Sequence, residues 1–400
     1  MGMITRAIGL GSRRLNTKRI MDLPPPLKHD ALLPYLSNDT ALGRRVKQHI
    51  QEEGYIVLPN ILSRDECAVE LDRLWDFVEA TSPGVCRNDS NSWYPSPLHH
   101  DLAESNNDAR ESTTTDPWPH SGWNFLPDMC QSFQAGWLFG SLREILADRV
   151  FEPLYGTRQL HSSKEGFTFH RPTAPVASNG AIHPVLGRER PRVCGKVQIK
   201  GRGEHFDQCA SDTGLHCIQS STALIDQDMD DGCFQCWPKS HNEHPRITQG
   251  IWRGRSDWVP LTDEELDMLR QKGMEPKRVP VRAGDVILWR SDLVHCGVGP
   301  SSPRSGFRAV SYTCMLPAAM TPLDVREGKL EEYLTMQTGD HRPNVKSRHF
   351  ANPKKENEKK KHDVSAEKDA INIKVARGQY FADGPPILTL RQAELYGLVS

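Results

Sequence analysis

Glu204-His205-Phe206-Asp207-Gln208 is the stretch from which the fold and function of this chain are best deduced. In an extended strand, successive side chains alternate between two faces, so His205 and Asp207 point to one side and Phe206 to the other. A third ligand from a distant strand would complete two imidazoles and one carboxylate, and His295 follows another apolar run. That set holds one face of a non-haem Fe(II) ion. With 16 His in the chain, such a tripeptide is common by chance, so the surrounding residues decide its meaning.

Length and charge exclude several classes of protein. The 400 residues suffice for one large domain or two ordinary ones. A net charge of −1 gives no reason to expect nucleic acid or a membrane surface as a partner. No apolar run approaches the roughly 18 residues of a membrane span. The ten Cys are dispersed, which favours reduced thiols and a cytoplasmic location.

The N-terminus is basic and rich in proline. Its cations precede the first acid, Asp22, and are Arg6, Arg13, Arg14, Lys18 and Arg19. Such a start is found in mitochondrial transit peptides, and a disordered leader is the alternative. We expect residues 1–38 to be a flexible leader, with a mitochondrial location as the alternative to a cytoplasmic one.

Helical and strand patterns then alternate along the chain. Helical spacing is found at 39–53, 133–154 and 262–269, and a capping box, Ser63 to Glu66, begins a further helix. After the candidate ligands the pattern is mainly β. The expected strands are 55–58, 166–169, 193–199, 220–226, 233–237, 286–289 and 308–316.

Several basic residues could bind an anion. Arg308 opens an apolar strand, where burial of its charge is costly unless it meets an anion. Arg304 is a rival, but it lies in a Ser/Pro/Gly loop. Lys196 and Gln198 share strand parity and could face the same pocket. They belong to a basic run, 188–202, which either attracts an anionic substrate or is a solvated loop.

The ordered set of motifs resembles the phytanoyl-CoA dioxygenase (PhyH) family over roughly residues 45–317. It comprises the entry Glu53–Pro59, His205-x-Asp207, Asp231-Gly232-Cys233, Trp237–His241, Gly284-Asp285, His295 and Gly306-Phe307-Arg308. The resemblance implies a mainly β fold with flanking helices around a double-stranded β-helix, the jelly-roll or cupin-like core. One departure is Lys239, which stands where the family's Pro-Gly-Ser-His turn has glycine.

The resemblance also implies an activity. His205, Asp207 and His295 would bind Fe(II), and Arg308 would bind the 5-carboxylate of the cosubstrate 2-oxoglutarate, with O2 as the oxidant. The expected reaction is oxidation of a C–H bond, foremost hydroxylation, in a small organic substrate such as a secondary-metabolism intermediate or an acyl compound. A jelly-roll oxygenase that does not use 2-oxoglutarate and a catalytically silent binding protein are the alternatives.

The domain organisation follows from these assignments. We expect a single catalytic domain over 39–330. Residues 331–400 would form a C-terminal extension with a Lys-rich insertion, whose apolar end, 388–398, can pack on the core.

Overall fold

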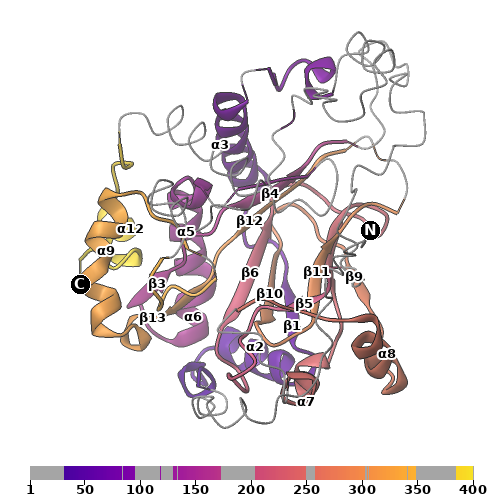
Figure 1. Ribbon diagram of the computed structural model, residues 1–400. Coiled ribbons are helices and arrows are strands. Elements are labelled where there is room, and N and C mark those ends of the chain that lie inside the picture. The colour runs from indigo at the N-terminus through magenta and orange to yellow at the C-terminus, as the bar shows by residue number, and fades with distance from the viewer. Residues whose placement is uncertain are drawn as a thin grey trace, which may run out of the picture.

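A computed structural model shows two large antiparallel β-sheets with helices packed around them (Figure 1). It describes residues 31–82, 84–94, 118, 129–132, 134–172, 203–248, 257–301, 304, 306–339, 341–347 and 384–399. The expected leader up to residue 30, the basic run 188–202 with Lys196 and Gln198, and the Lys-rich insertion lie outside these residues. No helix in the described part of the chain is long and apolar enough to cross a membrane.

The larger sheet has six strands in the order β1-β10-β6-β12-β4-β2. Their bounds are Tyr55–Leu58 (β1), Val286–Arg290 (β10), Ile218–Ala223 (β6), Arg308–Tyr312 (β12), Phe167–His170 (β4) and Met129–Ser132 (β2). The smaller sheet has the order β8-β5-β11-β7-β9. Its strands are Val259–Pro260 (β8), His205–Phe206 (β5), His295–Val298 (β11), Cys233–Cys236 (β7) and Lys277–Val279 (β9).

The path of the chain between the sheets makes the core a double-stranded β-helix. From β4 to β7 the chain passes from one sheet to the other at every step, and it does so again from β9 to β12. Every paired strand is antiparallel to its neighbours. Jelly-roll folds arise from this arrangement of paired strands wound together. The expected fold class is therefore confirmed.

Three apolar clusters pack against the sheets, one inside the barrel and one on the outer face of each sheet. The inner cluster joins both sheets and contains Ala223, Phe234, Ile287 and Trp289, among others. Outside the larger sheet, helices α3 (Arg64–Thr81) and α5 (Gly140–Leu146) pack on the opposite side chains of its strands. Outside the smaller sheet, α7 (His244–Thr248) and α8 (Asp263–Gln271) do the same. Every second side chain along these strands points into the barrel, and these inward side chains can line a binding site.

The entry to the domain follows the sequence closely. Helix α2 (Ala41–Glu52) ends before Gly54, whose φ of +87° suits a residue without a Cβ, and β1 follows at once. The capping box of Ser63 and Glu66 begins α3 as predicted, and Thr262 and Glu265 begin α8 in the same way. Three short helices lie next to longer ones: η1 (Leu33–Tyr35) precedes α2, η2 (Ser90–Trp93) follows α3, and η5 (Ser240–Glu243) precedes α7.

Two predicted elements are each divided in the structure. The helical region 133–154 forms η3 (Gln134–Trp137), α5, a π-helical turn η4 (Ala147–Phe151) and α6 (Glu152–Tyr155). The strand expected over 308–316 ends at Tyr312, and β13 (Met315–Pro317) pairs with β3 (Leu160–Ser162) in a separate sheet. The backbone changes partners here because Cys314 and Ser163 bond to each other instead of to the larger sheet.

The turn that departs from the family pattern keeps a left-handed residue. Lys239 has a φ of +69°, a conformation that glycine adopts most readily. Its backbone N–H donates to the Glu53 carbonyl at 3.0 Å, and its ammonium lies 3.3 Å from the Glu53 carboxylate. These contacts with the entry segment support the strained backbone, and the turn is formed without the glycine.

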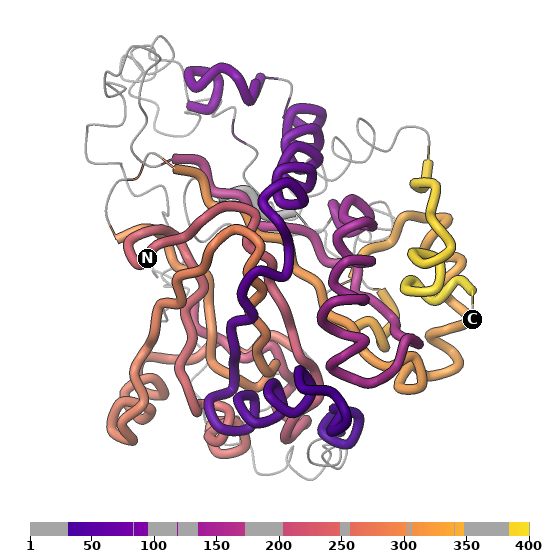
Figure 2. The backbone as a smooth tube through the Cα atoms, turned by 180° about the vertical axis from the view of Figure 1, so that it is seen from behind, coloured from indigo at the N-terminus to yellow at the C-terminus, as the bar shows by residue number. Residues whose placement is uncertain are grey.

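The C-terminal helices lie on the same side of the molecule as α5 and α6 (Figures 1 and 2). They are η6 (Ala318–Met320), α9 (Leu323–Leu334) and α12 (Leu390–Leu395). A fourth apolar cluster contains Trp137, Met336 and Tyr396, with Tyr333 and Leu388 packed against it. The apolar end of the chain therefore packs back on the core, as the sequence predicts.

Candidate active site

His205, Asp207 and His295 meet at one edge of the smaller sheet. Because β5 and β11 are antiparallel neighbours, His205 lies directly opposite His295, and Asp207 follows β5. One ligand atom from each of the three lies within 4.8 Å of the others. His205 Nε2 is 3.4 Å from Asp207 Oδ1, and His295 Nε2 is 3.3 Å from Asp207 Oδ2. The three side chains thus form a group that could hold a metal ion.

Backbone carbonyls orient both imidazoles. His205 Nδ1 lies 2.7 Å from the Gly203 carbonyl, and His295 Nδ1 lies 3.0 Å from the Leu293 carbonyl. A carbonyl only accepts, so each Nδ1 carries the hydrogen and donates it. The Nε2 lone pairs are then free to face the centre of the group. Metal-binding histidines are commonly fixed in this way.

The charges within the group are strongly coupled. Burial alone would raise the pKa of Asp207, but the facing imidazoles of His205 and His341 outweigh it and hold this pKa well below its usual range. Burial would lower the pKa of His205, yet the Asp207 carboxylate raises it. Burial, with His205 beside it, lowers the pKa of His295. The carboxylate is therefore ionised and the site favours a positive charge at its centre.

Three residues outside the triad hold Asp207. Gln219 Nε2 on β6 donates to Asp207 Oδ2 at 2.8 Å. The Asp207 N–H donates to the Ser291 carbonyl at 2.9 Å. His341, which belongs to the C-terminal extension, places Nε2 2.8 Å from the Asp207 carbonyl and Nδ1 3.9 Å from Oδ2. With Oδ2 bonded to Gln219, Oδ1 is the oxygen left for a cation.

Aromatic rings surround His295 on the inside of the barrel. The Trp289 ring centroid lies 5.4 Å away, and Phe234 stacks at 5.8 Å with an interplanar angle of 28°. Trp258 lies 5.8 Å from the His205 ring and is 37% exposed. The apolar wall limits water beside the triad, which strengthens electrostatic contacts there.

Arg308 lies buried at the start of β12 and shares its strand face with Tyr312 of the inner cluster. Its Nε donates to the Gln227 amide oxygen at 3.3 Å, and its register partner on β4 is His170. Three buried nitrogens at this place have no hydrogen-bond partner among the described residues: Arg308 Nη1, His170 Nε2 and Gln227 Nε2. A buried cation with unpartnered donors beside it suits a carboxylate ligand.

Arg304, the rival of Arg308, has other partners. Its guanidinium lies 3.2 Å from Asp230 and 3.3 Å from Asp231, both on the turn before β7. Its positive charge is thus balanced by neighbouring carboxylates. Arg308 forms no ion pair in the described part of the chain, which distinguishes the two.

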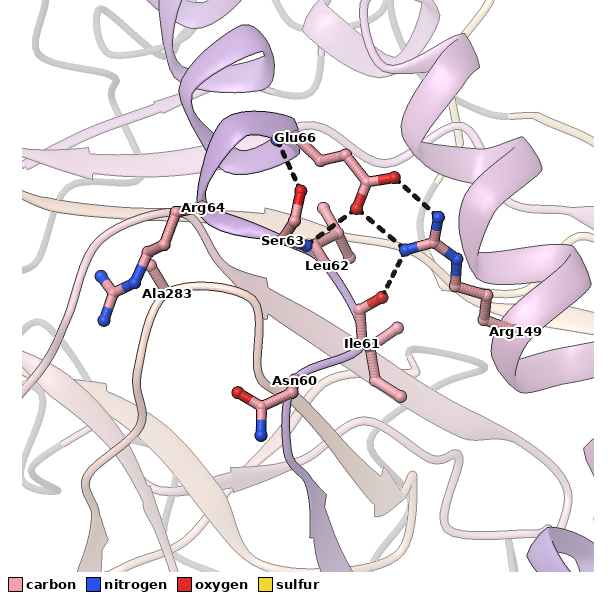
Figure 3. A pocket seen from close by; sticks show the side chains of 8 residues that line it. All are labelled: Asn60, Ile61, Leu62, Ser63, Arg64, Glu66, Arg149 and Ala283. Carbon is pink, nitrogen blue, oxygen red and sulfur yellow. Dashed lines mark hydrogen bonds and ion pairs between the residues drawn. The ribbon is translucent and has the colours of Figure 1, made fainter.

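One cavity lies away from these residues. It has a volume of about 430 Å³ and is lined by the start of α3, the loop before it, Arg149 and Ala283 (Figure 3). Its charges are already matched, since Glu66 accepts from Arg149 and caps α3 through Ser63. A second cavity of about 20 Å³ adjoins Arg308 and is lined by His170 and Gly232, among others.

The structure brings together three of the residues singled out in the sequence, places a fourth in the same barrel, and adds four others. His205, Asp207 and His295 meet, and Arg308 is buried in the same barrel; Lys196 and Gln198 lie outside the described residues. The added residues are His170, Gln219, Gln227 and His341. Strand parity could have pointed to His170 and Gln219, which share faces with inward residues. No local pattern marks His341.

Comparison with known proteins agrees with this site. The family model of phytanoyl-CoA dioxygenase (PhyH) matches residues 200–308. No curated protein sequence matches the chain.

Several solved structures are distantly similar. EctD from S. alaskensis, with 2-oxoglutarate and 5-hydroxyectoine, is 14% identical, with 74% of this chain and 83% of that chain covered and a TM-score of 0.41. The epimerase SnoN, in complex with Fe3+, alpha ketoglutarate and nogalamycin RO, is 16% identical, with 69% and 83% covered and a TM-score of 0.37. HygX from Streptomyces hygroscopicus, with nickel, 2-oxoglutarate and hygromycin B, is 16% identical, with 68% and 87% covered and a TM-score of 0.35.

The matched segment contains His205, Asp207, His295 and Arg308. Residues 200–308 thus form a phytanoyl-CoA dioxygenase domain, and the chain is an Fe(II)- and 2-oxoglutarate-dependent oxygenase.

Proposed function

We propose that His205 Nε2, His295 Nε2 and Asp207 Oδ1 bind the Fe(II) ion. The observation that carries this proposal is the close approach of these three side chains, with one ligand atom from each inside a 4.8 Å limit. Both imidazoles are held with Nε2 towards the centre, and Gln219 occupies the other carboxylate oxygen. Two imidazoles and one carboxylate leave three positions open on an octahedral ion.

Arg308 is proposed to hold the far carboxylate of 2-oxoglutarate. Its Nη1, together with His170 Nε2 and Gln227 Nε2, supplies nitrogens that have no partner in the described structure. Three such groups around one carboxylate would satisfy atoms whose burial is otherwise costly. When bound, Fe(II) and 2-oxoglutarate together activate O2 and supply the oxidant for a substrate C–H bond.

The expected net reaction is a hydroxylation. Substrate, 2-oxoglutarate and O2 give the hydroxylated product, succinate and CO2, so that one oxygen atom enters each organic product. Asp207 supports this outcome over halogenation, because a carboxylate fills the position that a halide would need. Trp289 and Phe234 would shield the reacting centre from water.

We propose a small organic molecule as the substrate, either an intermediate of secondary metabolism or an acyl compound, and the cytoplasm as the location. Trp258 presents a partly exposed aromatic ring beside His205. Such a ring suits an organic molecule with an apolar face. An anionic substrate stays a prediction from the basic run 188–202.

Anaerobic spectroscopy tests this function directly. Addition of Fe(II) and 2-oxoglutarate to the full-length protein should produce a visible metal-to-ligand charge-transfer band. Asp207→Ala should remove it, whereas Asp267→Ala, at an exposed pair with Arg270, should leave it unchanged. Absence of the band from the unmodified protein would contradict the proposal. Candidate substrates can then be screened by the succinate release that they stimulate.

A further inference from the structure

We propose that His341, from the C-terminal extension, is a positioning residue that fixes Asp207 for metal binding. The inference rests on the proposed function, since it takes Asp207 as a ligand of Fe(II). His341 is 6% exposed and touches Asp207 at two points, its backbone carbonyl and its carboxylate. It is separated from Asp207 by 134 positions in the sequence.

Asp207 needs such support because it lies beyond the end of its strand. The ladder of β5 covers only His205 and Phe206, so the Asp207 carbonyl has no ladder partner on the neighbouring strands that the structure describes. His341 Nε2 donates to this carbonyl at 2.8 Å. Together with the Asp207 N–H bond to Ser291, this contact fixes the peptide groups on both sides of the Asp207 Cα. The carboxylate can then turn only about its own side-chain bonds.

Neighbours of His341 hold it in place on the side of the metal site. The Cys217 thiol, next to β6, donates to the His341 carbonyl at 3.3 Å. Arg342 Nη1 lies 3.1 Å from the Asp212 carboxylate and 3.7 Å from Asp257. The His341 carbonyl and the Arg342 side chain are therefore tied to segments near β5 and β6.

A buried ion pair docks the rest of this segment. Lys164, which precedes β4, pairs with Glu332 on α9, and both are 5% exposed. Glu332 also accepts from the Ser347 N–H at 2.8 Å, and Lys329 donates to the Pro343 carbonyl at 3.0 Å. Residues 341–347 are thus held from α9, and α9 is held from the core. These contacts together hold His341 next to Asp207.

Aromatic packing beside this ion pair supports the same connection, since the Lys164 ammonium lies 5.4 Å from the centroid of the Trp137 ring. The Trp137 indole donates to the Gln337 carbonyl at 3.1 Å and lies 5.5 Å from the Tyr333 ring. The boundary expected at residue 330 falls within α9, which spans Leu323–Leu334. We infer that residues 331–347 belong functionally to the catalytic domain.

The test uses two substitutions of similar size at His341. His341→Met keeps the volume but removes the donor, and His341→Gln restores a donor that can reach the Asp207 carbonyl. Lys346→Ala is the matched control, because this residue is in the same segment and pairs only with the exposed Asp324 in the described structure. For each full-length variant, Fe(II) affinity is measured anaerobically by titration, and the Fe(II)-2-oxoglutarate band is recorded; circular dichroism verifies folding.

His341→Met is expected to weaken Fe(II) binding about tenfold to a hundredfold and to shift the band, as loss of an outer partner of a ligand commonly does. His341→Gln should recover most of the affinity, and Lys346→Ala should match the unmodified protein. Unchanged affinity and band in a folded His341→Met variant would overturn the inference while the proposed function stands. A missing band in the unmodified protein would overturn the proposed function itself.

Discussion

His170 and Arg308 lie directly opposite each other on β4 and β12, and both are buried. Burial and the positive charge of Arg308 lower the pKa of His170 to about 3, so this imidazole is neutral at pH 7. Arg308 is therefore a cation beside a neutral ring, and in the described part of the chain its guanidinium donates to the Gln227 amide oxygen. Burial of the Arg308 guanidinium without an anionic partner costs free energy, which a bound carboxylate would offset.

Replacement of Arg308 should impair use of the cosubstrate. Arg308→Met removes a charge-assisted, double-contact partner and should raise the KM for 2-oxoglutarate by about a hundredfold. Arg304→Ala should change it less than about threefold, because Arg304 pairs with Asp230 and Asp231. The measurement is succinate formation against 2-oxoglutarate concentration. A larger effect from Arg304→Ala would reverse the assignment.

A methyl group at Gly232 should crowd the same place. A Cβ added there would lie 2.9 Å from His170 Nδ1 and 3.2 Å from Arg308 Cδ, and the adjoining cavity measures only about 20 Å³. Gly232→Ala should therefore raise the KM for 2-oxoglutarate about tenfold. Gly328→Ala on α9, where an added Cβ meets nothing within 4 Å, is the control. Equal KM values for the two variants would refute the crowding.

The low pKa of His170 should make the protein less stable in acid. As the pH falls through 6.5, the unfolded chain binds a proton at His170, whereas the folded protein does so only near pH 3. Stability is lost over this window, and His170 alone should account for about 2 kcal/mol of unfolding free energy between pH 7 and pH 5. His170→Gln should lack this part of the loss in urea unfolding at the two pH values. An equal loss of unfolding free energy in the unmodified protein and in His170→Gln would contradict the lowered pKa of His170.

Disruption of the Lys164–Glu332 pair should destabilise the whole domain. Lys164→Met leaves the Glu332 carboxylate buried without this partner and should reduce the free energy of unfolding by about 3 kcal/mol. Lys346→Met, at the exposed pair with Asp324, should change it by less than about 0.5 kcal/mol. The double variant Lys164→Met/Glu332→Leu should recover part of the loss. Denaturant unfolding gives all three values, and a stable Lys164→Met variant would contradict the role of this pair.

Local patterns predicted the elements whose signals are short in range. The capping boxes at Ser63 and Thr262 begin helices at the expected residues, and the β-branched run at 286–289 lies within β10. The region 308–316 was wrongly expected to be one strand. Its change of sheet after Tyr312 depends on bonds between Cys314 and Ser163, which no local pattern reveals.

The sequence by itself determined which residues are candidates for the site, because strand alternation favours His205 and Asp207 on one face and an arginine that opens an apolar strand is costly to bury without an anion. Tertiary structure decided which further residues join them. The antiparallel pairing of β4 with β12 brings His170 to Arg308, and the docking of α9 brings His341 to Asp207. These contacts join residues distant in the chain, so they depend on packing and on hydrogen bonds that form only when the barrel and the C-terminal helices are assembled.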